Sequence, residues 1–203
     1  YSLGETPLDN VSLPMGSYRL RIQKEGFEDV LYPVEITRNH NWNGIPPNAT
    51  QILPIWLPPK GSLSTNERYI PAGHFQYGGD QTIDTKQKLT TLWLDGFIIA
   101  AHPFTNRQYI ALLNQAHNEH IEDVDQIQPQ SLIHGNQTAV CYGRDKDGHF
   151  FIQEDADGDL WELDWPVTCL AYDSICRAIE IYSKQTNKEY RLPSEEQWEK
   201  SAR

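Results

Sequence analysis

The sequence predicts a fold that contains both strands and helices, because segments with strand-like and with helix-like patterns both occur along the chain. Near the N-terminus, "SYRLRIQ" alternates apolar and polar residues and leads into the glycine turn "KEGF". Further on, two segments that begin near Thr105 and Tyr172 repeat apolar residues at helical spacing. No internal repeat and no low-complexity tract interrupts this order.

The chain has 203 residues, enough for one large domain or two small ones. Its formal net charge of −11 would repel nucleic-acid phosphates and anionic lipid headgroups, so we expect no nucleic-acid partner. No apolar run reaches the roughly 18 residues that a spanning helix needs, and we expect no membrane insertion. The first residue is Tyr1 rather than Met, which suggests a piece of a longer chain with any targeting segment upstream.

Residues 1–60 are expected to form a small all-β module. In its first strand Tyr18, Leu20 and Ile22 share one face, and "VLYPVEIT" supplies the second strand of a hairpin. "ILPIWLP" is a candidate third strand that its prolines would confine to a sheet edge. Residues 61–67 are expected to be a linker.

Residues 68–203 are expected to form the second domain. "YIPAGHFQYGGD" is interpreted as two strands joined by a glycine turn, and "LTTLWLDGFIIAA" as extended chain with Leu92, Leu94 and Phe97 in the core. Residues 121–140 match no pattern, and "GRDKDGHFFIQEDADGDLWELDWPV" indicates short strands joined by Asp-Gly turns.

Three helices are expected in this domain. The first follows an N-cap at Thr105, and its core face consists of Tyr109, Leu112, Leu113 and Ala116. The third begins after Ser194, which forms a capping box with Gln197. The second is expected to bury one face made of Tyr172, Ile175, Cys176, Ile179 and Tyr182.

The candidate metal ligands are Asp155, Asp157 and Asp159 in "EDADGDLW". Alternate carboxylates in a glycine-containing loop are what calcium prefers. The order differs from an EF-hand, since the glycine comes fourth rather than sixth and no twelfth-position Glu follows. A solvated Asp-Gly turn is therefore the favoured interpretation, with calcium as the alternative.

Other side-chain groups have an ordinary structural explanation. His117 and His120 could share a metal, but no third ligand is identifiable and a helix C-terminus favours His in any case. The three cysteines form no CxxC pair and are interpreted as buried thiols in a reducing compartment. Three tryptophans are interpreted as core, with a ligand-binding aromatic patch as the alternative. These residues are Cys141, Cys169, Cys176, Trp161, Trp165 and Trp198.

Three segments resemble the formylglycine-generating-enzyme (sulfatase-modifying factor) family. "YIPAGHFQYGGD" is similar to that family's Pro-Ala-Gly strand, and residues 104–109, "FTNRQY", to its "VTN-x-x-Y" helix start. The most specific match is "RLPSEEQWEKSAR" at 191–203, in which Gln197 replaces the family's usual Glu and Ser201 an Ala. The resemblance covers about residues 68–203 and implies the N-terminal part of a C-type-lectin-like α+β fold.

The resemblance assigns no catalytic or cofactor-binding residue to this chain. In the family, the last motif is only the midpoint of the fold, and the copper-binding, redox-active cysteines come after it. Cys141, Cys169 and Cys176 do not match their motif. The resemblance therefore implies that a further C-terminal segment packs against Trp198 and the helix of residues 172–182.

Residues 1–60 resemble the PEGA-type β domain that precedes such domains in some bacterial serine/threonine kinases. This resemblance favours a non-catalytic ligand-binding or sensing module of a larger, cytoplasmic bacterial protein, with a protein or small-molecule ligand. Related lectin-like domains also carry binding sites varied by diversity-generating retroelements. The alternatives are a copper- or iron-dependent oxidase, of the formylglycine-generating or sulfoxide-synthase type, with its active site C-terminal to this chain, and a structural adaptor.

Overall fold

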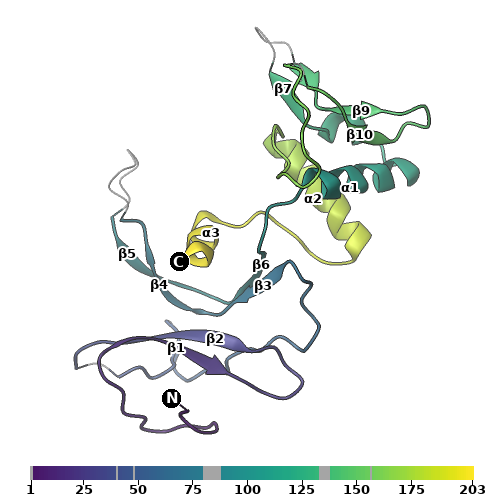
Figure 1. Ribbon diagram of the computed structural model, residues 1–203. Helices are drawn as coiled ribbons and strands as arrows, with labels where there is room; N and C mark the ends of the chain where they lie inside the picture. Colours follow the sequence, from purple (N-terminus) through teal and green to yellow (C-terminus); the bar gives the residue numbers. More distant parts are fainter. Residues whose placement is uncertain (1, 40, 48, 80–87, 133–137, 156) are drawn as a thin grey trace. The chain divides into compact units, whose positions relative to one another are not determined.

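The computed structural model divides the chain into two compact units (Figure 1). Unit 1 comprises Tyr1–Ala101 and Pro193–Arg203, and unit 2 comprises His102–Leu192. The boundaries expected at residues 60 and 67 stay a prediction. The structure describes residues 2–39, 41–47, 49–79, 88–132, 138–155 and 157–203.

Unit 1 begins with an antiparallel hairpin of β1 (Gly16–Ile22) and β2 (Val30–Ile36). The predicted alternation is confirmed, since Tyr18, Leu20 and Ile22 are more buried than the residues between them. The opposing strand buries an apolar face as well, and its fully buried residues are Val30, Tyr32 and Val34.

The predicted third strand "ILPIWLP" is wrong, because no strand forms over residues 52–58. The chain there makes a backbone contact with the hairpin turn instead, in which Glu28 N–H donates to Pro58 O at 2.8 Å. The prolines explain the difference: Pro54 and Pro58 lack the N–H groups that a ladder needs.

Four further strands of unit 1 form two antiparallel pairs. β3 (Glu67–Ile70) pairs with β6 (Phe97–Ala100), and β4 (Gly73–Tyr77) pairs with β5 (Thr90–Leu94). The extended segments were therefore predicted correctly, but "YIPAGHFQYGGD" does not pair with itself. The side chains expected in the core, Leu92, Leu94 and Phe97, are half-buried.

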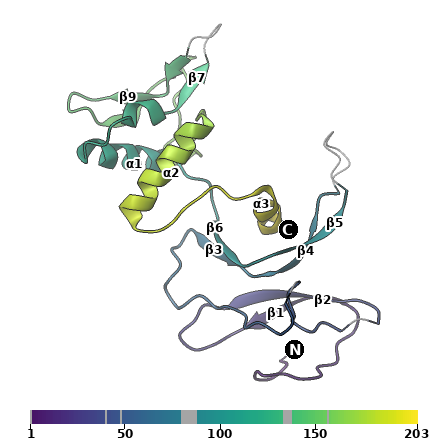
Figure 2. The same cartoon turned by 180° about the vertical axis from the view of Figure 1, so that it is seen from behind.

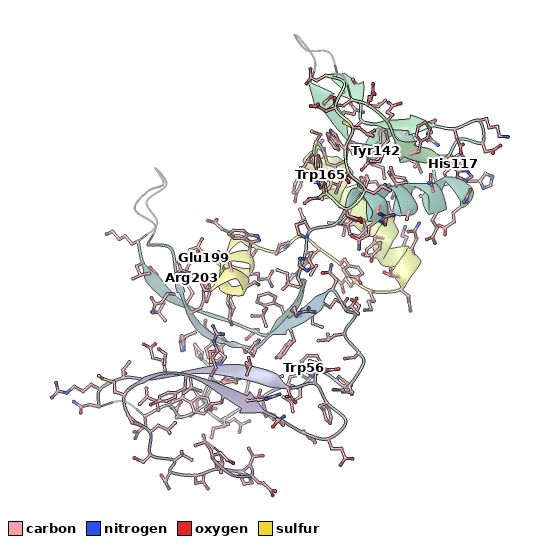
Figure 3. The ribbon with its side chains drawn as sticks, viewed as in Figure 1. Trp56, His117, Tyr142, Trp165, Glu199 and Arg203 are labelled. Atoms are coloured by element: carbon pink, nitrogen blue, oxygen red, sulfur yellow. The ribbon has the colours of Figure 1, made fainter. Side chains whose placement is uncertain are left out.

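Helix α3 (Glu195–Ala202) belongs to unit 1 and has the predicted capping box of Ser194 and Gln197. It lies against β4 in both views (Figures 1 and 2). Glu199 of α3 and Arg203, the residue that follows the helix, hold the glycine that comes after β4. Glu199 Oε1 accepts from Gly78 N–H at 3.0 Å, and Arg203 donates to Gly78 O at 2.9 Å and to Glu199 (Figure 3).

Lys200 fixes the same helix through a buried ammonium group. The residue is 8% exposed, and its Nζ donates to the carbonyl oxygens of Pro71, Gly73 and Leu94 at 2.8, 3.0 and 3.2 Å. Trp198, in contrast, is 64% exposed. The docking of α3 therefore depends on its polar side chains, and the expected covering of Trp198 by a further segment stays a prediction.

Unit 2 is built around α1 (Asn106–Asn118), which begins with the predicted N-cap Thr105 and a capping box with Gln108. Its four predicted core residues are all buried. The remaining elements are the 3₁₀ turn η1 (Val124–Ile127), β7 (Gln130–Leu132) paired with β8 (Thr138–Val140), β9 (Tyr142–Arg144) paired with β10 (Phe150–Ile152), and α2 (Tyr172–Thr186).

The buried face of α2 differs from the predicted one. Full burial falls on Ala178 and Ile181, which contribute to the core of unit 2, whereas Tyr172 is 69% exposed. Tyr182 still contacts the core through the ring of Phe104, with centroids 5.1 Å apart. Helical periodicity identifies the apolar stripe of a helix, but it does not show which edge of that stripe will pack against α1. In α2, the small residue Ala178 allows the close approach. None of the described helices is long and apolar enough to cross a membrane.

Candidate ligand-binding site

Two loops of unit 2 share one geometry. Asp145 opens the loop "DKDGH", and Asp155 opens the loop "DADGD". In each, Oδ1 of the first aspartate accepts hydrogen bonds from the backbone N–H groups two and four residues later, at 2.9 Å in the first loop and 3.0 Å in the second. The fourth-position glycines have φ of +85° and +84°, a conformation that favours glycine. Both loops are thus closed by their own first carboxylate.

These bonds occupy the carboxylate that a calcium ion would need. Asp155 Oδ2 also accepts a hydrogen bond from Trp161 Nε1 at 3.0 Å. The hydrogen bonds to this carboxylate lower the pKa of Asp155, and the bond from Asp159 N–H has the largest effect. Asp157 and Asp159 are exposed. Within the described ranges no three His, Cys, Asp or Glu side chains are arranged to hold a metal ion. Calcium at Asp155, Asp157 and Asp159 stays a prediction, and it would compete with the loop's own hydrogen bonds.

The other residues that the sequence suggested as site candidates do not come together in one place. His117 lies next to His149, with ring centroids 5.6 Å apart, and His120 is exposed. The prediction of buried thiols holds for Cys141 but is wrong for Cys169, which is exposed in the segment before α2.

The prediction that all three tryptophans lie in the core is wrong for two of them. Trp161 packs against the core of unit 2, but Trp165 is 55% exposed and Trp198 64% exposed. Trp165 follows a loop whose backbone, rather than its side chain, meets α1: the Trp165 carbonyl accepts from Asn106 N–H at 2.9 Å. Helix or strand periodicity predicts burial only for residues within a helix or a strand, and it gives no reason to expect burial for a tryptophan in a loop.

A hollow of about 400 Å³ in unit 1 was not predicted from the sequence. Its walls come from β2, from the proline-rich segment after it and from the strands β3, β5 and β6. The lining residues are Tyr32, Gly44, Pro46, Leu53, Pro54, Ile55, Trp56, Tyr69, Ala72, Trp93, Asp95, Gly96, Phe97 and Ile98. A volume within the roughly 300–1,000 Å³ range and a mainly apolar lining are typical of small-molecule sites.

Two aromatic rings form a corner of this hollow. Trp56 and Tyr69 have ring centroids 4.8 Å apart and ring planes at 71°, and Trp56 is 50% exposed (Figure 3). Burial raises the pKa of Tyr69, and the nearby Tyr32 adds to this shift. Gly96 makes room for the Tyr69 ring, because a Cβ at Gly96 would collide with the Tyr69 hydroxyl. The corner is thus packed on one side and open on the other.

Asp95 carries the charge among the lining residues. Its Oδ1 accepts a hydrogen bond from Trp93 Nε1 at 3.2 Å, which fixes the carboxylate beside an indole ring. The sequence signal for this site is the run of tryptophan and proline in "NWNGIPPNATQILPIWLPP", of which "ILPIWLP" is the candidate edge strand described above. Aromatic and proline side chains without a strand ladder can line a ligand groove instead.

The described elements define an α+β protein with an aromatic-lined hollow in unit 1. Residues 59–203 match the model of the sulfatase-modifying factor enzyme 1-like domain, and the chain belongs to that family. Residues 1–45 match the PEGA domain model. No curated protein and no solved structure matches the chain. The resemblance to both families that the motifs indicated is thereby confirmed.

Proposed function

We propose that this chain is a non-catalytic ligand-binding or sensing module and that the aromatic hollow of unit 1 is its binding site. The observation that carries the proposal is the origin of the walls. Tyr32 lies in the segment that matches the PEGA domain, and Tyr69 and Trp93 lie in the segment that matches the sulfatase-modifying factor domain. A ligand that contacts both would stabilise their packing, because any molecule that binds only the assembled form shifts the equilibrium toward it.

We also propose that the module belongs to a larger, cytoplasmic bacterial protein with a serine/threonine kinase domain. The PEGA domain match of residues 1–45 supports this context. A C-type-lectin-like arrangement, a retroelement-diversified surface and a further C-terminal segment that packs against Trp198 are part of the same proposal. A ligand signal would then pass to the kinase through the packing of the two family segments.

The binding site can be tested with four probes of different chemistry: choline, benzoate, glucose and indole. We expect saturation-transfer NMR to detect at least one of them on the full chain, and its signal to fall about tenfold on Trp56→Leu, as expected for the loss of one aromatic wall. Trp165→Leu removes an equally exposed indole outside the hollow and serves as the matched control. If no probe binds, or if both variants bind alike, the proposed site is wrong.

The family match favours one alternative, an oxidase whose active site lies C-terminal to these residues. We expect the isolated chain to leave a Cys-x-Pro-x-Arg peptide unchanged in the presence of copper and oxygen, because its cysteines do not match the family's redox motif. Mass spectrometry would detect the aldehyde. Clear turnover by the wild type that is lost in a variant without cysteines would contradict a non-catalytic role.

A further inference from the structure

We propose that the ligand of the aromatic hollow is a small organic cation with an alkylated ammonium group. This inference rests on the proposed function and names the ligand class of the same site. Three properties of the lining carry it: aromatic faces, a fixed carboxylate and the charge of the protein around them.

The aromatic faces favour a cation over a neutral apolar molecule. Trp56 and Tyr69 stand at 71° to one another, so a compact group in the corner contacts the two rings from different directions. Phe97 and Trp93 extend the aromatic surface. The electron-rich face of an aromatic ring attracts a cation, most strongly for tryptophan, and cages of such rings bind quaternary ammonium groups.

The charge favours the same ligand. Asp95 Oδ1 is held by Trp93, and in the part of the chain that the structure describes its Oδ2 has no hydrogen-bond partner, so that oxygen is free to face a ligand. The chain's formal net charge of −11 adds an attractive field for cations and a repulsive one for anions.

Lys200 is a cation whose charge affects this carboxylate. Its charge interacts with Asp95, but its ammonium hydrogens go to the carbonyl groups of Pro71, Gly73 and Leu94. It therefore makes no hydrogen bond to Asp95. Lys200 weakens the field of Asp95 without occupying the hollow.

A sugar is the main competing ligand, since sugars also stack on tryptophan. Specific sugar binding would need several convergent hydrogen-bonding groups, because each buried hydroxyl without a partner costs about 1–3 kcal/mol. The polar side-chain groups of the lining are the Asp95 carboxylate, the hydroxyls of Tyr32 and Tyr69 and the indole N–H groups of Trp56 and Trp93. The N–H of Trp93 already donates to Asp95. A compact alkylated ammonium group needs no such set, so the lining fits it better.

The test compares choline with 3,3-dimethyl-1-butanol, which has the same shape but no charge. We expect isothermal titration calorimetry on the full chain to show choline binding at least tenfold more tightly than the neutral alcohol. Trp56→Leu and Asp95→Asn are each expected to weaken choline binding about tenfold, and the asparagine keeps the acceptor for Trp93. Trp165→Leu and Asp173→Asn, at exposed positions of unit 2, are the matched controls and should bind choline as the wild type does.

The outcomes separate the ligand class from the proposed function. Equal binding of choline and its neutral isostere, or no effect of Asp95→Asn in a variant that melts like the wild type, would overturn the cation. Binding of glucose, benzoate or indole that depends on Trp56, without choline binding, would overturn the cation and leave the binding module intact. If none of the probes binds in a Trp56-dependent way, both proposals fail.

Discussion

Replacing Asn106 with alanine is expected to lower the free energy of unfolding of unit 2 by about 3 kcal/mol. Asn106 is fully buried, and its side chain joins two elements. Its Nδ2 donates to Glu162 O at 2.9 Å, and its Oδ1 accepts from Tyr142 OH at 2.7 Å. Alanine would leave the buried Tyr142 hydroxyl without a partner, which costs about 1–3 kcal/mol. It would also remove one of the two hydrogen bonds that Glu162 O accepts, the other coming from Trp165 N–H.

Urea unfolding followed by circular dichroism would measure this loss. Tyr142→Phe removes only the hydroxyl and should cost less than the alanine variant. Asn118→Ala is the matched control, because Asn118 is exposed on the same helix and accepts one hydrogen bond from His149. We expect that variant to stay within about 0.5 kcal/mol of the wild type. An Asn106 variant as stable as the Asn118 variant would show that the network does not hold unit 2 together.

Lys200→Met is expected to lower the stability of unit 1 by about 2 kcal/mol at pH 7, the balance of two opposing effects. Burial penalises the ammonium and lowers the pKa of Lys200 to about 8, although the charge of Asp95 acts in the opposite direction. Methionine removes that penalty, but it also leaves the carbonyls of Pro71, Gly73 and Leu94 without their donor. Three charge-assisted hydrogen bonds, each contributing about 1.5–3 kcal/mol, outweigh a penalty of about 3 kcal/mol.

The pH dependence of the same variant has a definite sign. The folded-state pKa of about 8 is below the ordinary value of 10.5, so between these values the unfolded chain binds more protons. Wild-type stability should therefore rise with pH in this window relative to Lys200→Met, by about 1–2 kcal/mol between pH 7 and pH 9.5. Lys184→Met, at an exposed position of α2, is the control and should show no such trend. A gap that narrows toward pH 9.5 would contradict the buried, destabilised ammonium.

Local signals predicted the elements of this protein well. The capping boxes at Thr105 and Ser194 and the alternation of β1 depend on residues a few positions apart, so the sequence alone was sufficient to locate them. The family motif at residues 191–203 could also be recognised from the sequence. Its physical role could not be predicted, because Lys200 and Glu199 bind residues more than a hundred positions away.

The candidate site could not be predicted from the sequence for the same reason. Tyr32, Trp56 and Asp95 come from three separate segments, and no periodicity links them. The segment at 52–58 was misjudged because its apolar residues suggested a strand while its prolines prevented one. The Asp-Gly turn predicted at Asp155 agrees better with the structure. A turn closed by its own carboxylate depends only on neighbouring residues, so its sequence is sufficient to predict it.

Unit 2 is one continuous stretch of sequence, whereas unit 1 is interrupted by it. A ribosome therefore delivers every residue of unit 2 before unit 1 has all of its own. Until residues 193–203 are synthesised, the carbonyl groups of Pro71, Gly73 and Leu94 lack the hydrogen bonds from the Lys200 ammonium. Gly78 likewise lacks its hydrogen bond to Glu199. Because domains tend to fold as they emerge, the inserted unit would mature first, and the unit that begins the chain would be the last to close.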